Sequence, residues 1–125
     1  MKGRRIMKYI DGYVLPVPKK NLAAYRRMAA ACSKIWRKNG ALEFCECVGD
    51  DLKTIEVKSF PSLVKPKRGE TIVFSWIVYK SKADRDRIND KVMKDPRIVR
   101  MMKNRKQPFD CKRMSYGGFK MMVDA

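Results

Sequence analysis

The chain of 125 residues is 45% hydrophobic and 34% charged, which is typical of one folded domain, and it contains no apolar run of the roughly 20 residues that a membrane span needs. Its formal net charge of +17 favours polyanionic partners such as nucleic acid, although net charge does not specify a fold. The sequence contains no histidine, which excludes Ser-His-Asp and Cys-His catalytic triads and histidine-ligated haem.

The first predicted elements are a strand and a long helix. Residues 8–17 are rich in Tyr, Ile and Val and end among prolines, which predicts a strand with Asp11 between two tyrosines on one face. Residues 18–40 place apolar side chains on one arc and seven Lys or Arg on the opposite arc. This pattern predicts an amphipathic helix that packs on a sheet and ends at Gly40.

The middle of the chain predicts two strands and a connection. Residues 41–51 form a strand that is closed by a Gly-Asp-Asp turn. Residues 52–69 contain Pro and Lys and form a connection, in which a short strand is expected at about 54–60. Residues 70–80 are almost continuously apolar, which predicts a strand that is buried on both faces.

The last part of the chain predicts two helices and a final strand. Residues 81–95 begin with the capping pattern Ser-x-x-Asp at Ser81, and residues 96–104 form a short helix behind Asp95 and a proline. Residues 111–124 read as a strand that two adjacent glycines interrupt. Adjacent glycines in a strand are typical of a bulge or of a close approach by another group.

The order strand-helix-strand-strand-helix-strand predicts an α+β fold of the ferredoxin-like type. In this fold a four-stranded antiparallel sheet carries both main helices on one face. The helices leave the other face uncovered, whereas the strand at 70–80 is apolar on both of its faces. A second copy of the chain is the simplest cover for that face, so we expect a homodimer.

One known family resembles most of the chain, and the likeness is carried by "YIDGYVLPVPKKNLAAYRRMA", "IWRKNGALEFCECVGDD", "GETIVFSWIVYKSKADRDRINDKVMKDPR" and "PFDCKRMSYGGFKMMVD". These segments resemble the DUF1428, or YbaA-like, family of small bacterial proteins of unassigned function, over about residues 7–124. The family is similar to the dimeric α+β barrels, a superfamily that includes monooxygenases of the antibiotic-biosynthesis type and haem-degrading enzymes. The resemblance implies one domain over residues 7–125, after an extension of residues 1–6. It also implies a homodimer whose two sheets form a barrel, with a cavity between sheet and helices in each subunit, but it implies no reaction.

Three residues are candidates for a catalytic role. Asp11 reads as a base or substrate anchor, or else as one half of an ion pair or part of a turn with the next glycine. Glu46 shares a strand face with apolar residues and needs a hydrogen-bond donor, for which Arg113 is the candidate. The alternative interpretation is that Glu46 forms a structural ion pair or lies at a strand edge in contact with water. Tyr116, beside the glycine pair, is the best candidate for a hydroxyl group in a cavity.

The candidates for ligand binding come from several strands. Aromatic residues at the spacing of a strand or a helix face are more often part of a core than of a binding site. The glycine pair marks the approach of a partner subunit or a ligand, or else a simple bulge. The candidate residues are Tyr13, Ser75, Trp76, Arg113, Gly117 and Gly118.

The four cysteines lack the C-x-x-C spacing of zinc sites, so we interpret them as reduced thiols and expect no metal and no cofactor. The preferred hypothesis is a small cytoplasmic homodimer that binds or transforms a small molecule in a cavity between sheet and helices. The alternatives are a basic protein associated with nucleic acid and a structural dimer without catalytic activity. Nucleic-acid binding should weaken strongly between low and high salt, whereas binding of a small molecule in the cavity should not. No membrane partner is expected.

Overall fold

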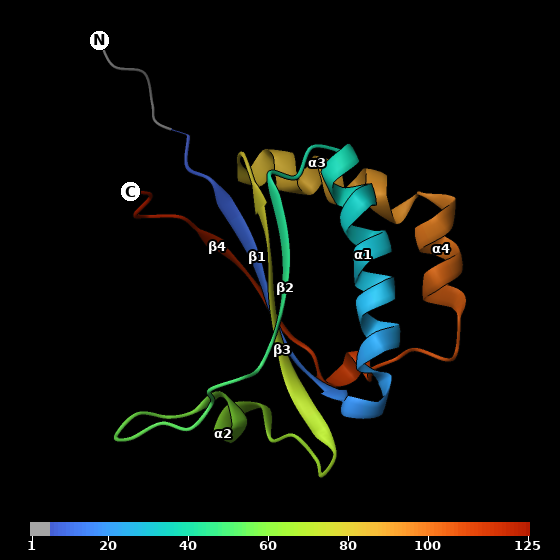
Figure 1. Ribbon diagram of the computed structural model, residues 1–125. Helices are drawn as coiled ribbons and strands as arrows, with labels where there is room; N and C mark the ends of the chain where they lie inside the picture. Colours follow the sequence, from blue (N-terminus) through green and yellow to red (C-terminus); the bar gives the residue numbers. More distant parts are fainter. Residues whose placement is uncertain (1–5) are drawn as a thin grey trace.

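The computed structural model describes residues 6–125, which form one sheet with a layer of helices on one side (Figure 1). The predicted extension of residues 1–6 lies, for residues 1–5, outside the described part of the chain. Within residues 6–125 no helix has both the length and the apolar character needed to cross a bilayer. The main elements are β1 (Tyr9–Pro18), α1 (Leu22–Lys38), β2 (Glu43–Val48), β3 (Glu70–Tyr79), α3 (Lys82–Met93) and β4 (Ser115–Lys120). Two shorter helices, α2 (Phe60–Val64) and α4 (Pro96–Lys103), and the 3-10 turns Lys19–Asn21 and Cys111–Arg113 complete the list.

The sheet has the strand order β2-β3-β1-β4, and all its neighbouring strands are antiparallel. Strands β1 and β2 therefore run in the same direction with β3 between them, and β3 and β4 do so with β1 between them. This is the split βαβ arrangement of ferredoxin-like proteins, so the predicted fold class is confirmed.

The helix ends follow the capping residues that the sequence indicated. Gly40 lies just beyond α1 with φ of +117°, a conformation that glycine adopts without strain. The Ser81 hydroxyl accepts a hydrogen bond from the Asp84 backbone N–H at 3.1 Å, and α3 begins there. The Asp95 carboxylate likewise accepts from the Arg97 backbone N–H at 2.8 Å and caps α4. Local side-chain chemistry thus sets where each of these helices begins or ends.

Two predicted strands differ from the structure. The short strand expected at 54–60 is wrong, because residues 55–57 are bends and α2 begins at Phe60, capped by the Ser59 hydroxyl. An Ile-x-Val alternation forms a strand only where another strand is available to pair with it. The final strand is shorter than expected. It begins after a 3-10 turn that Asp110 caps, and it ends at Lys120.

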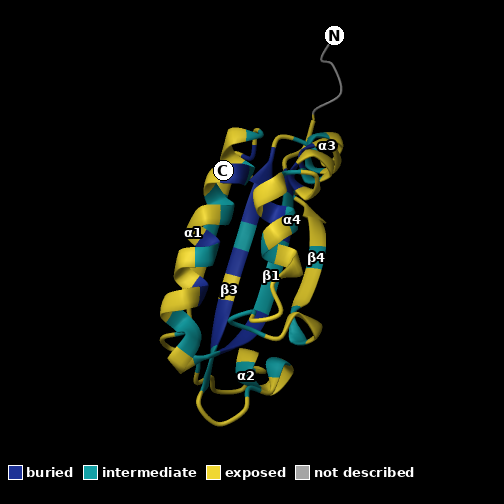
Figure 2. Ribbon diagram, turned by 90° about the vertical axis from the view of Figure 1, so that its right-hand side faces the viewer, coloured by how far each residue is buried: buried dark blue, intermediate teal, exposed yellow. Residues whose placement is uncertain are grey.

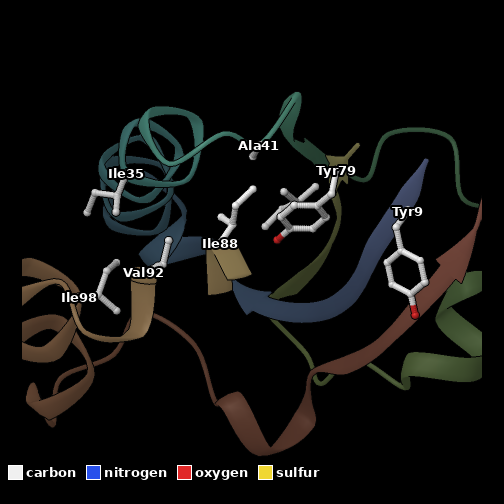
Figure 3. Packing of buried hydrophobic residues seen from close by; sticks show 8 residues of the cluster. Tyr9, Ile35, Ala41, Tyr79, Ile88, Val92 and Ile98 are labelled. Carbon is white, nitrogen blue, oxygen red and sulfur yellow. The ribbon is translucent and has the colours of Figure 1, made fainter. Parts of the chain in front are cut away.

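The core lies between the helix layer and one face of the sheet. Figure 3 shows Ile35 of α1, Ile88 and Val92 of α3 and Ile98 of α4 gathered near Tyr79 of β3. All five side chains are at most 3% exposed. Burying each one contributes about 1.5–3 kcal/mol relative to leaving it exposed, and this packing fixes the helices on the sheet.

The opposite face of the sheet, called here the uncovered face, carries none of the helices α1, α3 and α4 (Figure 1), although the short helix α2 contacts part of it, where Phe60 stacks on Phe74 with ring centroids 5.9 Å apart. Its side chains include Phe74 and Phe119, which are 45% and 61% exposed. The strand register shows that no position on this face is Lys or Arg, although the chain contains 30 of them. The face consists of alternate residues of the four strands: 10, 12, 14, 16 and 18; 70, 72, 74, 76 and 78; 43, 45 and 47; and 115, 117 and 119.

The glycine pair of β4 is explained by contacts within the chain. A Cβ atom on Gly118 would lie 2.5 Å from the Tyr9 hydroxyl and 2.8 Å from Tyr9 Cε2, so glycine makes room for this ring. Gly117 lies on the uncovered face, where a Cβ atom would be 3.3 Å from the Phe119 ring. The close approach at Gly118 therefore comes from β1 of the same chain.

We expect Gly118→Ala to destabilise the protein by about 1–3 kcal/mol, because the added methyl group collides with a buried ring that Arg85 holds in place. Gly117→Ala is the matched control, and its cost should stay below about 1 kcal/mol because the contact is looser and alanine is better than glycine inside a strand. Urea denaturation of both variants measures the difference. Equal midpoints would show that Tyr9 moves aside freely.

Candidate functional site

A straight line of polar side chains crosses the helix-covered face of the sheet. The register pairs Glu46 of β2 with Ser75 of β3, Ser75 with Tyr13 of β1, and Tyr13 with Tyr116 of β4. Paired residues of neighbouring strands point to the same side, so these four side chains form one row, called here the polar row. The structure thus aligns four of the predicted site residues.

A cleft opens above the first part of this row, between α1 and the strands β2 and β3. Its main part has a volume of about 480 Å³, and a smaller part of about 150 Å³ lies deeper against the sheet. Both parts share four lining residues, so we treat them as one site, called here the α1 cleft. The shared residues are Tyr25, Ala29, Phe44 and Glu46.

Glu46 is the carboxylate of the α1 cleft. It stands on an edge strand, where much of the residue is exposed, but its carboxyl group turns in under α1. The Tyr25 hydroxyl donates a hydrogen bond to Glu46 Oε1 at 2.7 Å. Loss of water around the carboxyl group raises the pKa of Glu46, and hydrogen bonds from Tyr25 and Ser75 oppose this rise in part.

The predicted pairing of Glu46 with Arg113 is wrong. Arg113 lies in the 3-10 turn before β4, and its guanidinium donates to Glu70 Oε2 at 2.7 Å. This hydrogen bond is the main reason that the pKa of Glu70 is lowered. Glu46 instead takes its donor from α1, because that helix passes directly over β2.

Asp11 lies beside the polar row and is fully buried. The Tyr116 hydroxyl donates to Asp11 Oδ1 at 3.0 Å, and Arg85 Nε of α3 lies 3.7 Å from the same oxygen. Arg85 also donates to the Tyr9 hydroxyl at 3.2 Å, with its guanidinium carbon 4.9 Å from the centre of that ring. The ion-pair interpretation of Asp11 therefore fits the structure. Removing one partner of such a buried pair costs about 3–5 kcal/mol, so this contact fastens α3 to the sheet.

The two tyrosines of the polar row stack on each other. The ring centroids of Tyr13 and Tyr116 are 5.0 Å apart. Burial is the main cause that raises the pKa of both phenols, and the charge of Asp11 adds to the shift. Both hydroxyls therefore stay protonated at neutral pH, and Tyr116 is half-exposed although its hydroxyl is bonded to Asp11.

The remaining predicted ligand residues are Trp76 and the two glycines of β4. The Trp76 ring contacts Phe74 of the uncovered face at 5.5 Å between centroids, although Trp76 also borders the deeper part of the α1 cleft. Gly117 lies on the uncovered face, and Gly118 lies under Tyr9. The structure therefore brings Tyr13, Ser75 and Trp76, but not the glycines, to the cleft.

Sequence reasoning missed two residues of this region. Tyr25 was placed in the apolar arc of the helix, yet a buried tyrosine hydroxyl needs a partner, and this need was a usable signal. Arg85 stands in the run Asp-Arg-Asp-Arg, where nothing distinguishes the arginine that reaches the sheet from the one that stays on the surface.

The cysteines are free, and burial raises the pKa of the Cys32 thiol to about 11. Such a thiol is protonated and unreactive at neutral pH. Within residues 6–125 no three His, Cys, Asp or Glu side chains gather in a way that could hold a metal ion. The chemistry available to the cleft is that of a carboxyl group, hydroxyl groups, the Arg26 guanidinium at its border and an apolar wall.

We expect Glu46→Gln to become more stable relative to the wild type as the pH rises. The raised pKa means that the folded protein binds the Glu46 proton more tightly than the unfolded chain does, so this contribution to stability is lost as the pH rises from the ordinary glutamate value. Glutamine cannot ionise. Thermal melts between pH 4 and pH 8 should show the gap in Tm growing with pH, with Glu56→Gln as a control for the loss of one negative charge. A constant gap would contradict the raised pKa.

Comparisons with known proteins place the chain in a family. The model of the family described as "Protein of unknown function (DUF1428)" matches residues 8–111. Proteins described as uncharacterized protein YbaA, from Escherichia coli strain K12 and from Shigella flexneri, are 44% identical over 118 residues, which cover 94% of this chain and 99% of theirs. A solved structure of a dimeric ferredoxin-like protein from an uncultured marine organism has a TM-score of 0.61 at 9% identity, covering 95% of this chain and 99% of that one. This structural likeness supports the fold, and the family model and the relatives together show that the chain belongs to the DUF1428 family.

Proposed function

We propose that the protein is a homodimer in which each subunit binds a small, mainly apolar molecule in the α1 cleft, with Glu46 as the polar anchor. The observation that carries this proposal is a single carboxyl group in a cleft whose wall is mainly apolar, with Arg26 and Ser33 at its border. Glu46 is held there by the Tyr25 hydroxyl at 2.7 Å. Pockets for small molecules are usually apolar, with a few polar groups that fix the orientation of the ligand.

The lining of the cleft indicates the chemistry of the ligand. Its apolar wall consists of Leu22, Ala29, Phe44, Val48 and Val73. A carboxylate offers about four acceptor positions, which is more than Tyr25 and Ser75 fill. The ligand that fits is therefore a planar or compact apolar molecule with one hydroxyl or N–H group that donates to Glu46.

The same carboxyl group can exchange a proton with a bound molecule. Its raised pKa brings it closer to neutrality, which is the property of a general acid or base. Tyr25 keeps the carboxyl group in place while either form is present, because its hydroxyl can donate to the ionised form and accept from the protonated form.

The uncovered face supports the dimer. A solved relative in fold is described as dimeric. In a chain of net charge +17, two copies repel each other unless the contact excludes the cations, and the uncovered face contains none. The β2–β3 connection and the C-terminal segment extend on the same side as this face (Figure 1). They carry the exposed apolar side chains of Ile55, Val57, Leu63, Met122 and Val123, which can extend the contact around its edge.

Ligand binding can be tested with 2-naphthol, an apolar planar molecule with one hydroxyl donor, by isothermal titration calorimetry. We expect the wild type to bind 2-naphthol at least tenfold more tightly than 2-methoxynaphthalene, which lacks the donor; tenfold corresponds to about 1.4 kcal/mol. Ala30→Trp places an indole ring in the cleft from an exposed position of α1 and should abolish binding.

The matched control for the cleft is Ala31→Trp, at the next exposed position of α1, which does not line the cleft. This variant should bind 2-naphthol like the wild type. Equal binding by the two tryptophan variants, or no preference for the hydroxyl donor, would refute the cleft as the site. A dimer that binds neither probe would support the structural alternative.

The dimer is tested separately by light scattering coupled to size-exclusion chromatography at micromolar concentration. We expect the wild type to elute as a dimer and Phe119→Lys to elute as a folded monomer, because a lysine on the uncovered face puts two like charges into the contact. Met102→Lys changes a similarly exposed apolar residue of α4 and should leave the dimer intact. A monomeric wild type would refute the dimer.

A further inference from the structure

Two segments of the chain are rich in cations and contain no acidic residue. Residues 12–42 contain seven Lys or Arg, and residues 96–109 contain five. Within residues 6–125, Arg97 is the member of this set that forms an ion pair, with Asp95 at 2.8 Å. The other cations of these segments are not neutralised by neighbouring carboxylates, so they form a concentrated positive charge.

The fold brings these two segments together although about 70 residues separate them in the chain. The Asn21 side-chain amide donates to the Pro108 carbonyl oxygen at 3.1 Å. Further along, the thiol of Cys32 on α1 lies 3.5 Å from the sulfur of Met101 on α4. The outer surfaces of both helices are exposed on the same side of the molecule (Figure 2).

A groove of about 540 Å³ lies between the two segments, called here the α1–α4 groove. It is on the opposite flank of α1 from the α1 cleft, because Ala24 and Met28 line the groove whereas Arg26 and Ala30 line the cleft. The groove shares no lining residue with the main part of the cleft, and Met28 lies between the groove and the deeper part of the cleft and lines both. The groove is lined by Asn21, Ala24, Met28, Met101, Asn104, Lys106, Gln107 and Pro108.

The loop that follows α4 is held in one shape at the wall of the groove. The Gln107 side-chain amide donates both to the Met101 carbonyl at 2.7 Å and to the Asn104 carbonyl at 2.8 Å. The Asn104 side chain accepts from the Lys106 backbone N–H at 3.0 Å. The backbone of Lys106 is therefore held beside the groove before any ligand arrives, which reduces the backbone entropy lost on binding.

A row of exposed residues on α1 and its preceding turn borders the groove. The spacing of three and four residues puts Lys20, Ala24, Arg27, Ala31, Lys34 and Lys38 on one side of the helix, and all six are exposed. Seven residues, or about 10.5 Å along the helix axis, separate Lys20 from Arg27 and Arg27 from Lys34, and Lys38 follows one turn after Lys34. Alanine between the cations leaves room for a chain of phosphates to lie close to the helix.

We propose that the α1–α4 groove binds single-stranded nucleic acid through its phosphate backbone, without reading the sequence. The unpaired cations of the row and Lys106 supply the phosphate contacts. Met28 and Met101 offer apolar surface to the bases, and they show no pattern of donors that could distinguish one base from another. A duplex presents its phosphates on a stiff cylinder that cannot enter a groove of this size, so the single strand is the form that fits.

The test is fluorescence anisotropy of the full-length protein with a fluorescein-labelled 12-nucleotide oligothymidylate between 50 and 200 mM NaCl. If Lys20, Arg27, Lys34 and Lys106 each contact a phosphate, the slope of log K against log[salt] is about −3, and affinity falls roughly 50-fold over this range. Combining Lys20→Gln, Arg27→Gln and Lys106→Gln should reduce the slope to about −1 and weaken binding at 50 mM NaCl at least tenfold.

The matched control removes three positive charges on the other side of the molecule, in the β2–β3 connection: Lys53→Gln, Lys58→Gln and Lys67→Gln, all at exposed positions. This variant has the same net charge as the first, and its slope should stay at about −3. Circular dichroism melts of both variants check that the fold is retained.

Several outcomes would overturn the proposal. Equal loss of affinity in the two triple variants would mean that net charge alone drives binding. Equal or tighter binding of a 12-base-pair duplex would contradict the groove as the contact. Retention on vesicles of phosphatidylserine and phosphatidylcholine without any binding of the oligonucleotide would assign the positive surface to a membrane instead.

Discussion

The sheet carries its main helices on one face only, and this constraint shapes the rest of the molecule. A β-sheet with apolar residues on both faces needs cover on both. The helices α1, α3 and α4 supply one cover, and they enclose the side chains of Ile88, Val92 and Tyr79. Helix α1 then has three different surroundings: the sheet below it, the α1 cleft on one flank and the α1–α4 groove on the other.

The polar row results from the strand register. Antiparallel pairing puts residues from four distant segments in line, and one polar residue from each strand falls on the same level. A shift of one residue would send Ser75 and Tyr13 to the uncovered face. Asp11, with its partner Arg85, occupies the adjacent level. The contact from α3 to β1 therefore resists such a shift and preserves the line on which the candidate site is built.

Some parts of this arrangement could be predicted from the sequence, and others could not. The arc of cations opposite the arc of apolar residues predicted α1, and the alternation along the strands predicted that Glu46 and Asp11 are carboxylates among apolar neighbours. Their partners were not predictable in this way, because Tyr25 and Arg85 belong to helices. Which helical side chain meets which strand depends on the rotation and axial position of each helix over the sheet, and no local pattern contains these quantities. In the segment 54–60 a local pattern was present but misleading. Its alternation fits a strand, but no neighbouring strand is available to pair with it.

The distribution of charge connects the two proposals. Two molecules of net charge +17 associate more readily if most of their cations stay apart, and packing the uncovered faces together would keep the helix layers on opposite outer sides of the pair. In this arrangement each α1–α4 groove points away from the contact. If both proposals hold, a short single strand bound in one groove would not reach the other, so the dimer would take up two strands. Binding of an anionic strand also lowers the repulsion between subunits. Nucleic acid would therefore strengthen the dimer through long-range electrostatics alone, without touching the contact between the sheets.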